Sequence, residues 1–297
     1  MRNYVIITDT GCDLDGATRA EFGIEECLPM HFIINGKDYE ADLDWKEISA
    51  KDFYQTLRDG VRITSAQVGQ ESYKTAFKKY LEQGMDVLYV ATSSALSAGI
   101  KTAKIIAEEM KAEYPDAKII CVDALRACFA LGILAIMSSK LRAEGKTIEE
   151  TAAYIEENKL NVNMIGSVDS LVYLKRAGRV SATSAFFGGL LNIKPIIIAD
   201  AKGQNFAVEK VKGRKVSLNK IAERFAAAYE DNAYQEVFIC HADCIDEAEE
   251  LKKLICEKVG KELSVRIGYV GPGVGASVGP GMLGAFCVGK KVTENGD

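Results

Sequence analysis

Two clusters of serine and threonine are the residues of this chain best placed to bind a ligand. Thr64 and Ser65 follow a short strand-like run and precede a predicted helix over residues 70–83, and Thr92-Ser93-Ser94-Ala-Leu-Ser97 joins another strand-like run to the next helix. Hydroxyls and free backbone N–H groups at helix N-termini form a neutral receptor for a carboxylate or phosphate. Helix capping explains either cluster alone, but both together make anion binding an equal alternative.

A third serine lies in a glycine-rich stretch near the C-terminus. Gly275-Ala-Ser277-Val-Gly279 matches the G-x-S-x-G pattern of serine hydrolases. That pattern requires a strand before it, a helix after it and a later histidine. Pro280 and Gly281 follow at once, and no histidine lies beyond His241. A hydrolase or acyl-transfer enzyme using Ser277 is therefore kept only as an alternative.

Two further groups of polar residues have structural explanations that compete with function. Cys240-His241-Ala-Asp243-Cys244 supplies three types of metal ligand, but a structural zinc site needs four ligands, usually in two separated pairs. A strand end followed by a helix start is the favoured interpretation, so no metal is predicted. Asp9 and Asp13 follow the first predicted strand, where they could serve a site or cap a helix.

The elements that must position these residues predict an α/β protein in two parts. Buried, continuously apolar strands alternate with helices in the first part, which is typical of a layered domain with a mainly parallel sheet that binds ligands at the carboxyl ends of its strands. In the second part, turn residues at 200–204 predict a hairpin and a mixed or antiparallel sheet. We expect an N-terminal α/β domain over residues 1–159 and a C-terminal α/β domain over 160–297.

The predicted boundaries are as follows. Strands are expected at 4–8, 27–34, 86–92, 117–122, 162–165, 193–198, 205–211, 236–241 and 263–269, and helices at 50–58, 70–83, 97–113, 124–140, 147–158, 218–230 and 245–259. The helix over 124–140 is apolar on nearly every side, so it is expected in the core or against an apolar ligand cavity.

Composition excludes several functional classes. The 297 residues include 37 basic and 42 acidic ones, giving a net charge of −5, and no Lys/Arg run exceeds two residues. Binding to nucleic acid or to an anionic membrane surface is therefore not expected. The longest apolar stretch, residues 127–137, is too short to span a bilayer, and no signal peptide is evident. We expect a cytoplasmic protein whose eight cysteines stay reduced.

An ordered set of motifs resembles the DegV family, the fatty-acid-binding proteins that in some bacteria form the acyl-carrying subunit of a two-component fatty acid kinase. The match covers about residues 5–289. Its segments are Thr8-Asp-Thr-Gly-Cys-Asp-Leu14, Ile63-Thr-Ser-Ala66, Ser93-Ser-Ala-Leu-Ser97, Val122-Asp-Ala-Leu125, Leu174-Lys-Arg-Ala-Gly-Arg-Val-Ser181, Leu191-Asn-Ile-Lys-Pro195, and Val278-Gly-Pro-Gly281 with Leu283-Gly284.

The resemblance implies a non-catalytic carrier that encloses one long-chain fatty acid at the domain junction, with the tail in an apolar tunnel and no other cofactor. It places Thr64, Ser65 and Ser97 on the carboxylate and associates Arg179 with docking a kinase. Ser277 occupies the position where the family usually has histidine; a serine can donate a hydrogen bond but supplies no charge. Ser94 and Gly279 are expected to support the pocket. A binding module for another small anion is the remaining alternative.

Overall fold

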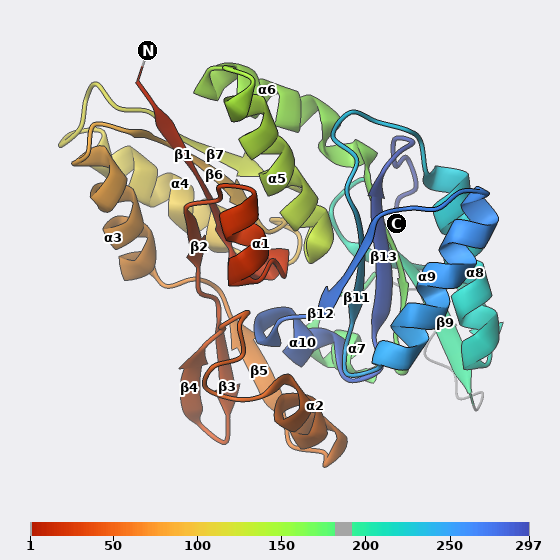
Figure 1. The fold of residues 1–297 in the computed structure, drawn as a ribbon. Helices are drawn as coiled ribbons and strands as arrows, with labels where there is room; N and C mark the ends of the chain where they lie inside the picture. Colours follow the sequence, from red (N-terminus) through yellow and green to blue (C-terminus); the bar gives the residue numbers. More distant parts are fainter. Residues whose placement is uncertain (1, 182–191, 297) are drawn as a thin grey trace.

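The computed structural model describes residues 2–181 and 192–296 (Figure 1). Up to residue 161 its elements are β1 (Tyr4–Asp9), η1 (Thr10–Cys12), α1 (Gly16–Glu21), β2 (Glu26–Leu28), β3 (His31–Ile34), β4 (Lys37–Glu40), α2 (Ala50–Arg58), β5 (Ile63–Ala66), α3 (Gln70–Leu81), β6 (Asp86–Ala91), α4 (Gly99–Met110), β7 (Ile119–Asp123), α5 (Phe129–Ala143), α6 (Ile148–Asn158) and η2 (Lys159–Asn161). The remaining elements are β8 (Val162–Ser167), α7 (Val172–Ala177), β9 (Ile193–Ala199), β10 (Asn205–Lys212), α8 (Arg214–Ala228), β11 (Val237–His241), α9 (Ile245–Val259), β12 (Val265–Tyr269), α10 (Pro272–Val278) and β13 (Leu283–Val288).

The first large sheet is the predicted parallel one. Its four strands lie in the order β2-β1-β6-β7, and every neighbouring pair is parallel. All residues of β1 and β6 are buried, since helices cover both faces of the sheet. This double burial explains why these strands are apolar throughout rather than alternating.

The second large sheet is mixed, as predicted. Its six strands lie in the order β10-β9-β8-β13-β11-β12, and only β11 and β12 run parallel. Our prediction missed β13, although it lies between β8 and β11 with all six residues buried. The glycine-rich turn Gly279-Pro-Gly281 precedes it, and its own Gly284 weakens the strand pattern. The domain boundary at residues 159 and 160 remains a prediction; β8 begins at Val162.

Helix α5 lies between the two large sheets (Figure 1). It packs against β1 and β6 on one side and against β8, β11 and β13 on the other. Residues 129–139 are all buried, which accounts for an apolar surface around most of the helix. It begins at Phe129 rather than at the predicted residue 124, because Leu125 and Cys128 have positive φ angles of 50° and 53°.

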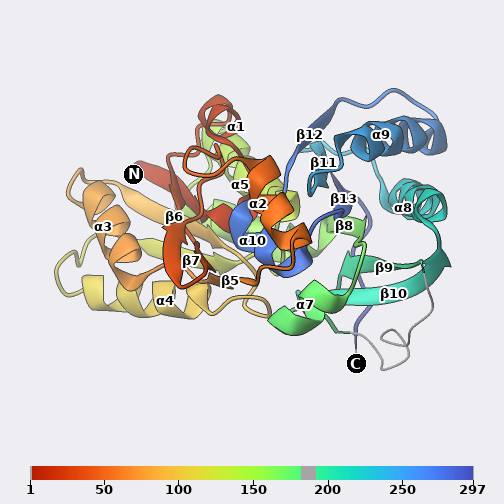
Figure 2. The ribbon, with the colours of Figure 1, turned by 90° about the horizontal axis from the view of Figure 1, so that it is seen from below.

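A small third sheet was not predicted. Strands β4-β3-β5 form an antiparallel sheet outside the parallel one, and the expected single strand over 27–34 is wrong. Pro29 lies where β2 ends and β3 has not begun; proline lacks the N–H that a continuous strand would use. Helix α10, from the far end of the chain, packs on β3, β5, α2 and α7 (Figure 2). The small sheet therefore lies where both halves of the chain meet.

Candidate ligand-binding site

Two cavities adjoin each other between the small sheet, α7 and α10. The inner cavity, of about 290 Å³, extends to residues of β8, β9 and the loop before α5. The outer cavity, of about 270 Å³, lies against residues 60–65 and α7. Ser65, Arg179 and Ser277 line both cavities. Ligand sites commonly occupy about 300–1,000 Å³, so the two together have the size of a small-molecule site.

The inner cavity has a mostly apolar lining. The apolar side chains around it are those of Met30, Leu96, Met164, Leu174, Val274, Val278 and Met282. Methionine is flexible and polarisable, so three methionines allow the wall to adapt to an alkyl chain. The body of α5 does not contribute, because only the preceding residues Arg126, Ala127 and Cys128 line this cavity. Helix α5 is thus a core helix, whereas residues 126–128 of the segment predicted as a helix over 124–140 line the inner cavity.

Thr64 and Ser65 lie inside β5 rather than beside a helix start. They pair with Ile33 and Phe32 of β3 in the small antiparallel sheet. Successive strand residues face opposite sides: Thr64 is exposed and lines only the outer cavity, whereas Ser65 is half-buried and lines both. The expected position at a carboxyl end of the parallel sheet is therefore wrong. These hydroxyls reach the cavities because α10 packs against β5.

The residues of the second hydroxyl cluster, Thr92 to Ser97, have different surroundings. Ser97 is half-buried and lines the inner cavity, and its Oγ accepts a hydrogen bond from Gly99 N at the start of α4 (3.2 Å). Ser93 is buried and donates from Oγ to the Gly203 carbonyl (2.8 Å), which ties this turn to the β9–β10 connection. Ser94 is exposed and lines neither cavity. Of the predicted pair from this cluster, only Ser97 faces the site.

Helix α10, which our prediction missed, positions Ser277 and Gly279. Ser277 lies in the last turn of α10, half-buried, between the two cavities. Gly279 ends the helix at φ 76° and donates its N–H to the Gly275 carbonyl. A Cβ atom there would overlap the Tyr173 ring, so Gly279 allows α10 to approach α7 closely. Its support for the site is indirect, since it lines neither cavity.

The surroundings of Ser277 do not match a nucleophile elbow. Such a serine sits on a sharp turn between a strand and a following helix, but Ser277 lies near the C-terminal end of α10 and precedes a loop. Within the described part of the chain, neither histidine has a hydrogen bond with it: His31 Nδ1 lies 3.1 Å from Asp38 Oδ1, and His241 Nδ1 accepts from Cys244 N (3.3 Å). This geometry provides no base for Ser277.

Asp9 and Asp13 contribute to the scaffold rather than to the cavity walls. Asp9 is buried and its carboxylate accepts hydrogen bonds from the N–H groups of Gly11 and Thr92 and from the Tyr89 hydroxyl (2.8–2.9 Å). Asp13 accepts from Gly271 N (2.9 Å), just before α10. Burial raises the pKa of Asp13 to about 7 despite that N–H donor. Both aspartates thus link loops around the junction.

Arginines also line the cavities, and of these only Arg179 was predicted from the sequence, as a contact of a kinase. Among the described residues, the outer cavity is lined by Arg62, Arg176 and Arg179 and the inner one by Arg126 and Arg179, while no acidic side chain lines either. The exposed Arg179 donates from Nε to the Leu96 carbonyl (3.1 Å), beside the Ser97 turn. The cavities thus hold guanidinium groups beside the hydroxyls of the predicted neutral receptor, and the residues that bind a carboxylate stay a prediction. Dispersed arginines form no basic run, so only folding reveals that they converge.

Arg126 is the functional candidate that the sequence signalled most weakly. It is fully buried and donates to the carbonyls of Val162 (2.6 Å), Leu125 (2.7 Å), Asp200 (3.1 Å) and Leu160 (3.4 Å). Its signal in the sequence is one charged residue at the start of the long apolar run. Such a residue normally marks the exposed edge of a helix, and here it is enclosed instead.

Comparison with known proteins identifies the relatives of this chain. A family model described as "Uncharacterised protein, DegV family" matches residues 3–290. The chain belongs to the DegV family. A DegV domain-containing protein of Clostridium perfringens is 36% identical over 97% of this chain and 98% of its own length. Another, from Lactococcus lactis, is 30% identical over 98% and 99%.

Solved structures share the DegV fold. A DegV family protein from Thermus thermophilus, described as binding fatty acid, has a TM-score of 0.85 and 24% identity, covering 98% of this chain and 100% of that one. A stearic acid-binding protein from Eubacterium ventriosum has a TM-score of 0.85 and 20% identity, covering 97% and 98%. At these identities the likeness establishes the fold.

The DegV motifs of this chain converge on the two cavities although they are distant in sequence. Thr64 and Ser65, Ser97, Arg179 and Ser277 come from four separate motifs, and each lines at least one cavity. Close approach of β5, the turn before α4, the end of α7 and α10 brings them together. Both halves of the chain therefore contribute motif residues to the lining of the same two cavities.

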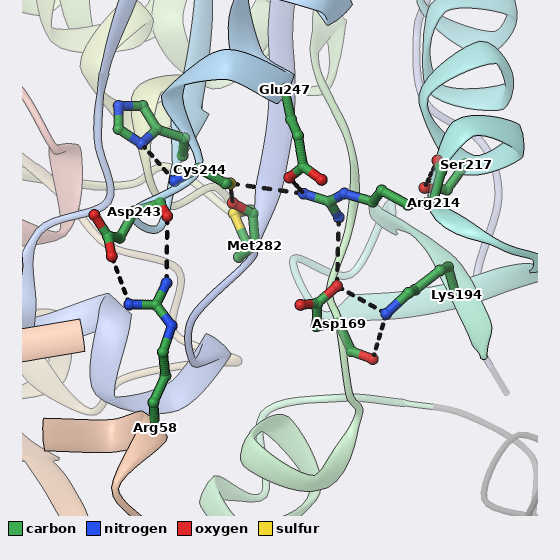
Figure 3. A network of polar contacts seen from close by, with 10 residues as sticks. Arg58, Asp169, Lys194, Arg214, Ser217, Asp243, Cys244, Glu247 and Met282 are labelled. Atoms are coloured by element: carbon green, nitrogen blue, oxygen red, sulfur yellow. Dashed lines mark hydrogen bonds and ion pairs between the residues drawn. The ribbon is translucent and has the colours of Figure 1, made fainter. Parts of the chain in front are cut away.

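A polar network holds this DegV junction together beside the cavities (Figure 3). Arg58, at the end of α2, bonds the carboxylate (2.5 Å) and carbonyl (3.2 Å) of Asp243 in the β11–α9 turn. On the other side of that turn, Arg214 bonds Glu247 (2.7 Å) and lies 3.9 Å from Asp169. The segment that had suggested metal ligands is thus occupied by protein contacts. Among residues 2–181 and 192–296, no group of His, Cys, Asp and Glu is arranged to hold a metal.

A third hollow lies elsewhere at the junction and has a different lining. This crevice, of about 370 Å³, is bordered by Asp13, Asp15 and Asp44 and by aromatic side chains that include Trp45 and Tyr269. Arg266 also borders it, but its guanidinium bonds both carboxylate oxygens of Glu21.

In the part of the chain that is described, no helix is both long and apolar enough to cross a membrane.

Proposed function

We propose that this chain binds one long-chain fatty acid, with the alkyl tail in the inner cavity and the carboxylate beside Ser65, Ser97 and Ser277. The observation that carries the proposal is the pairing of an apolar inner cavity with hydroxyls and arginines and without acidic residues in the described lining. A carboxylate gains hydrogen bonds and charge attraction there, and the tail gains burial. Fatty acid binding by DegV proteins of the same fold supports it.

We further propose that the protein performs no covalent chemistry and presents the carboxylate to a separate kinase, which forms an acyl phosphate. Thr64, exposed in the outer cavity, would contact the presented carboxylate, and the exposed Arg176 and Arg179 on and after α7 would meet the kinase. The absence of a base near Ser277 within the described residues favours a carrier over a hydrolase. The apolar inner lining favours an amphiphile over a small polar anion. A cytoplasmic location fits this role.

The first experiment identifies the copurifying ligand. Protein produced in bacterial cells is denatured gently and extracted, and mass spectrometry should find one long-chain fatty acid per chain. Clean apo spectra, together with no uptake of labelled palmitate, would overturn the proposal.

The second experiment tests presentation to a kinase. Palmitate-loaded protein is mixed with ATP and the catalytic component of a fatty acid kinase, and acyl phosphate is trapped with hydroxylamine. We expect hydroxamate from wild type and a reduced rate from Arg179→Glu. Arg224→Glu, on α8 away from both cavities, is the matched control. Normal palmitate binding with no hydroxamate from wild type would refute presentation alone.

A further inference from the structure

We infer that Arg126 makes the inner cavity selective for amphiphiles with a negatively charged head group over neutral lipids of the same length. The inference rests on the proposed function and deepens it, since it assigns the residue that determines which form of the ligand is bound. Arg126 and Arg179 are the charged residues in the described lining of this cavity, and only Arg126 is fully buried.

The first step is that no carboxylate contacts the guanidinium of Arg126, although the buried Asp200 carboxylate attracts it from farther away. All four of its hydrogen bonds go to backbone carbonyl oxygens, and none goes to a carboxylate. No Asp or Glu among residues 2–181 and 192–296 forms an ion pair with it. Neutral carbonyls satisfy the N–H groups of a guanidinium but leave its positive charge in place. Burial disfavours this charge more than Asp200 favours it, so an anion in the adjoining cavity would offset part of the remaining cost.

The second step is that the charge persists and acts over the length of the cavity. Burial lowers the pKa of Arg126 to about 10, with Asp200 acting in the opposite direction, so the guanidinium stays protonated at neutral pH. Charges enclosed by protein attract more strongly than charges in water, and salt screens them less. Direct contact with the ligand is therefore not required for selectivity.

A purely structural role makes a different prediction. Arg126 joins the loop before α5 to the start of β8 and to the turn after β9, so its loss would loosen all of these segments. Loosening would weaken the binding of charged and neutral ligands alike. Loss of charge would weaken the binding of the anion alone, so the ratio of two affinities separates these roles.

The test uses palmitate and hexadecanol, which share an alkyl chain and differ in the head group. Four proteins are compared: wild type, Arg126→Met, Arg126→Lys and Arg142→Met. Arg142 is the matched control because it also bonds backbone carbonyls, those of Tyr4 and Gly23, yet pairs with Glu25 and lines neither cavity. Carboxyl-labelled palmitate is followed by carbon NMR to obtain the pH at which the bound acid takes up a proton.

We expect wild type and Arg142→Met to prefer palmitate, and Arg126→Met to lose roughly tenfold or more of that preference. In Arg126→Met the bound carboxyl should protonate at a higher pH, and Arg126→Lys should restore both properties in part. An unchanged affinity ratio in folded Arg126→Met would overturn the inference. So would a wild-type protein that binds hexadecanol as tightly as palmitate, a result that needs no variant to fold. If wild type binds neither lipid, the proposed function itself fails.

Discussion

The paired cavities and the Asp13 crevice lie at the same junction but have opposite charge. The described residues around the cavities include four arginines and no acidic side chain, whereas the crevice is bordered by three aspartates and one arginine already paired with Glu21. The crevice, at about 370 Å³, is larger than either cavity. Lining charge, rather than volume, is therefore the reason for proposing the paired cavities as the site of an anionic ligand.

This contrast is local, because the whole chain has a net charge of −5. A net negative charge disfavours adsorption to anionic membranes, while the arginines around the cavities provide positive charge locally. Folding achieves the separation by bringing Arg62, Arg126, Arg176 and Arg179 to one side of the junction and Asp13, Asp15 and Asp44 to the other.

Filling the inner cavity should produce the largest effect. Val274, half-buried on α10, lines the inner cavity only, and Val274→Trp would place an indole where the alkyl chain is proposed to lie. We expect near-complete loss of labelled palmitate uptake, because close-packed interiors do not accommodate such added volume freely.

The matched control adds bulk to the crevice instead of the inner cavity. Thr18→Trp adds the same side chain beside the crevice, from α1, and should leave palmitate uptake unchanged. Thermal unfolding of both variants verifies that they fold. Reversed results would place the lipid in the crevice and invalidate the comparison.

The second largest effect should be a pH dependence of the protein's stability that arises from Asp13 in the crevice. The raised pKa of Asp13, about 7, means that the folded chain binds this proton more readily than the unfolded chain, whose aspartate titrates near pH 4. The stability of wild type should therefore fall as pH rises from about 4 to about 7, by a few kcal/mol at most from this group.

Asp13→Asn removes that titration while keeping the amide oxygen that can accept from Gly271 N. Asparagine also tolerates the positive φ of 57° at this position. Urea unfolding across the pH range should show wild type losing stability relative to Asp13→Asn as pH rises. Parallel curves would show that Asp13 is not held neutral by burial.

The sequence predicted those parts of the fold in which local pattern and burial agree. The continuously apolar runs that form β1 and β6 indicated a doubly covered parallel sheet, and α6 begins where predicted, with Thr147 and Glu150 forming a capping box. Helix α9 has the predicted bounds, Ile245–Val259. In each case the residues that determine the element lie within it or next to it.

The parts that were missed depend on contacts between distant segments. Strand β13 is buried between β8 and β11, which start far from it in sequence, and α10 is enclosed by β3, β5, α2 and α7. The hydroxyls that line the cavities were singled out because their motifs are local, but their positions in the fold were not predicted, and their contact with a ligand stays a prediction. Arg126 was not predicted as a cavity residue, because nothing next to it in the chain shows that carbonyls from β8 and the turn after β9 surround it.

Removing a single hydroxyl from the cavity lining should have the smallest effect on palmitate binding. Ser65 lines both cavities, so Ser65→Ala should weaken palmitate binding by about 1–3 kcal/mol, the cost of removing one donor from a charged acceptor. Ser94→Ala is the control, because Ser94 is exposed, lines neither cavity, and its backbone rather than its side chain bonds Asp123. Hexadecanol affinity should change less than palmitate affinity in Ser65→Ala. Equal losses for both lipids would mean that Ser65 shapes the wall between the cavities instead of binding the carboxylate.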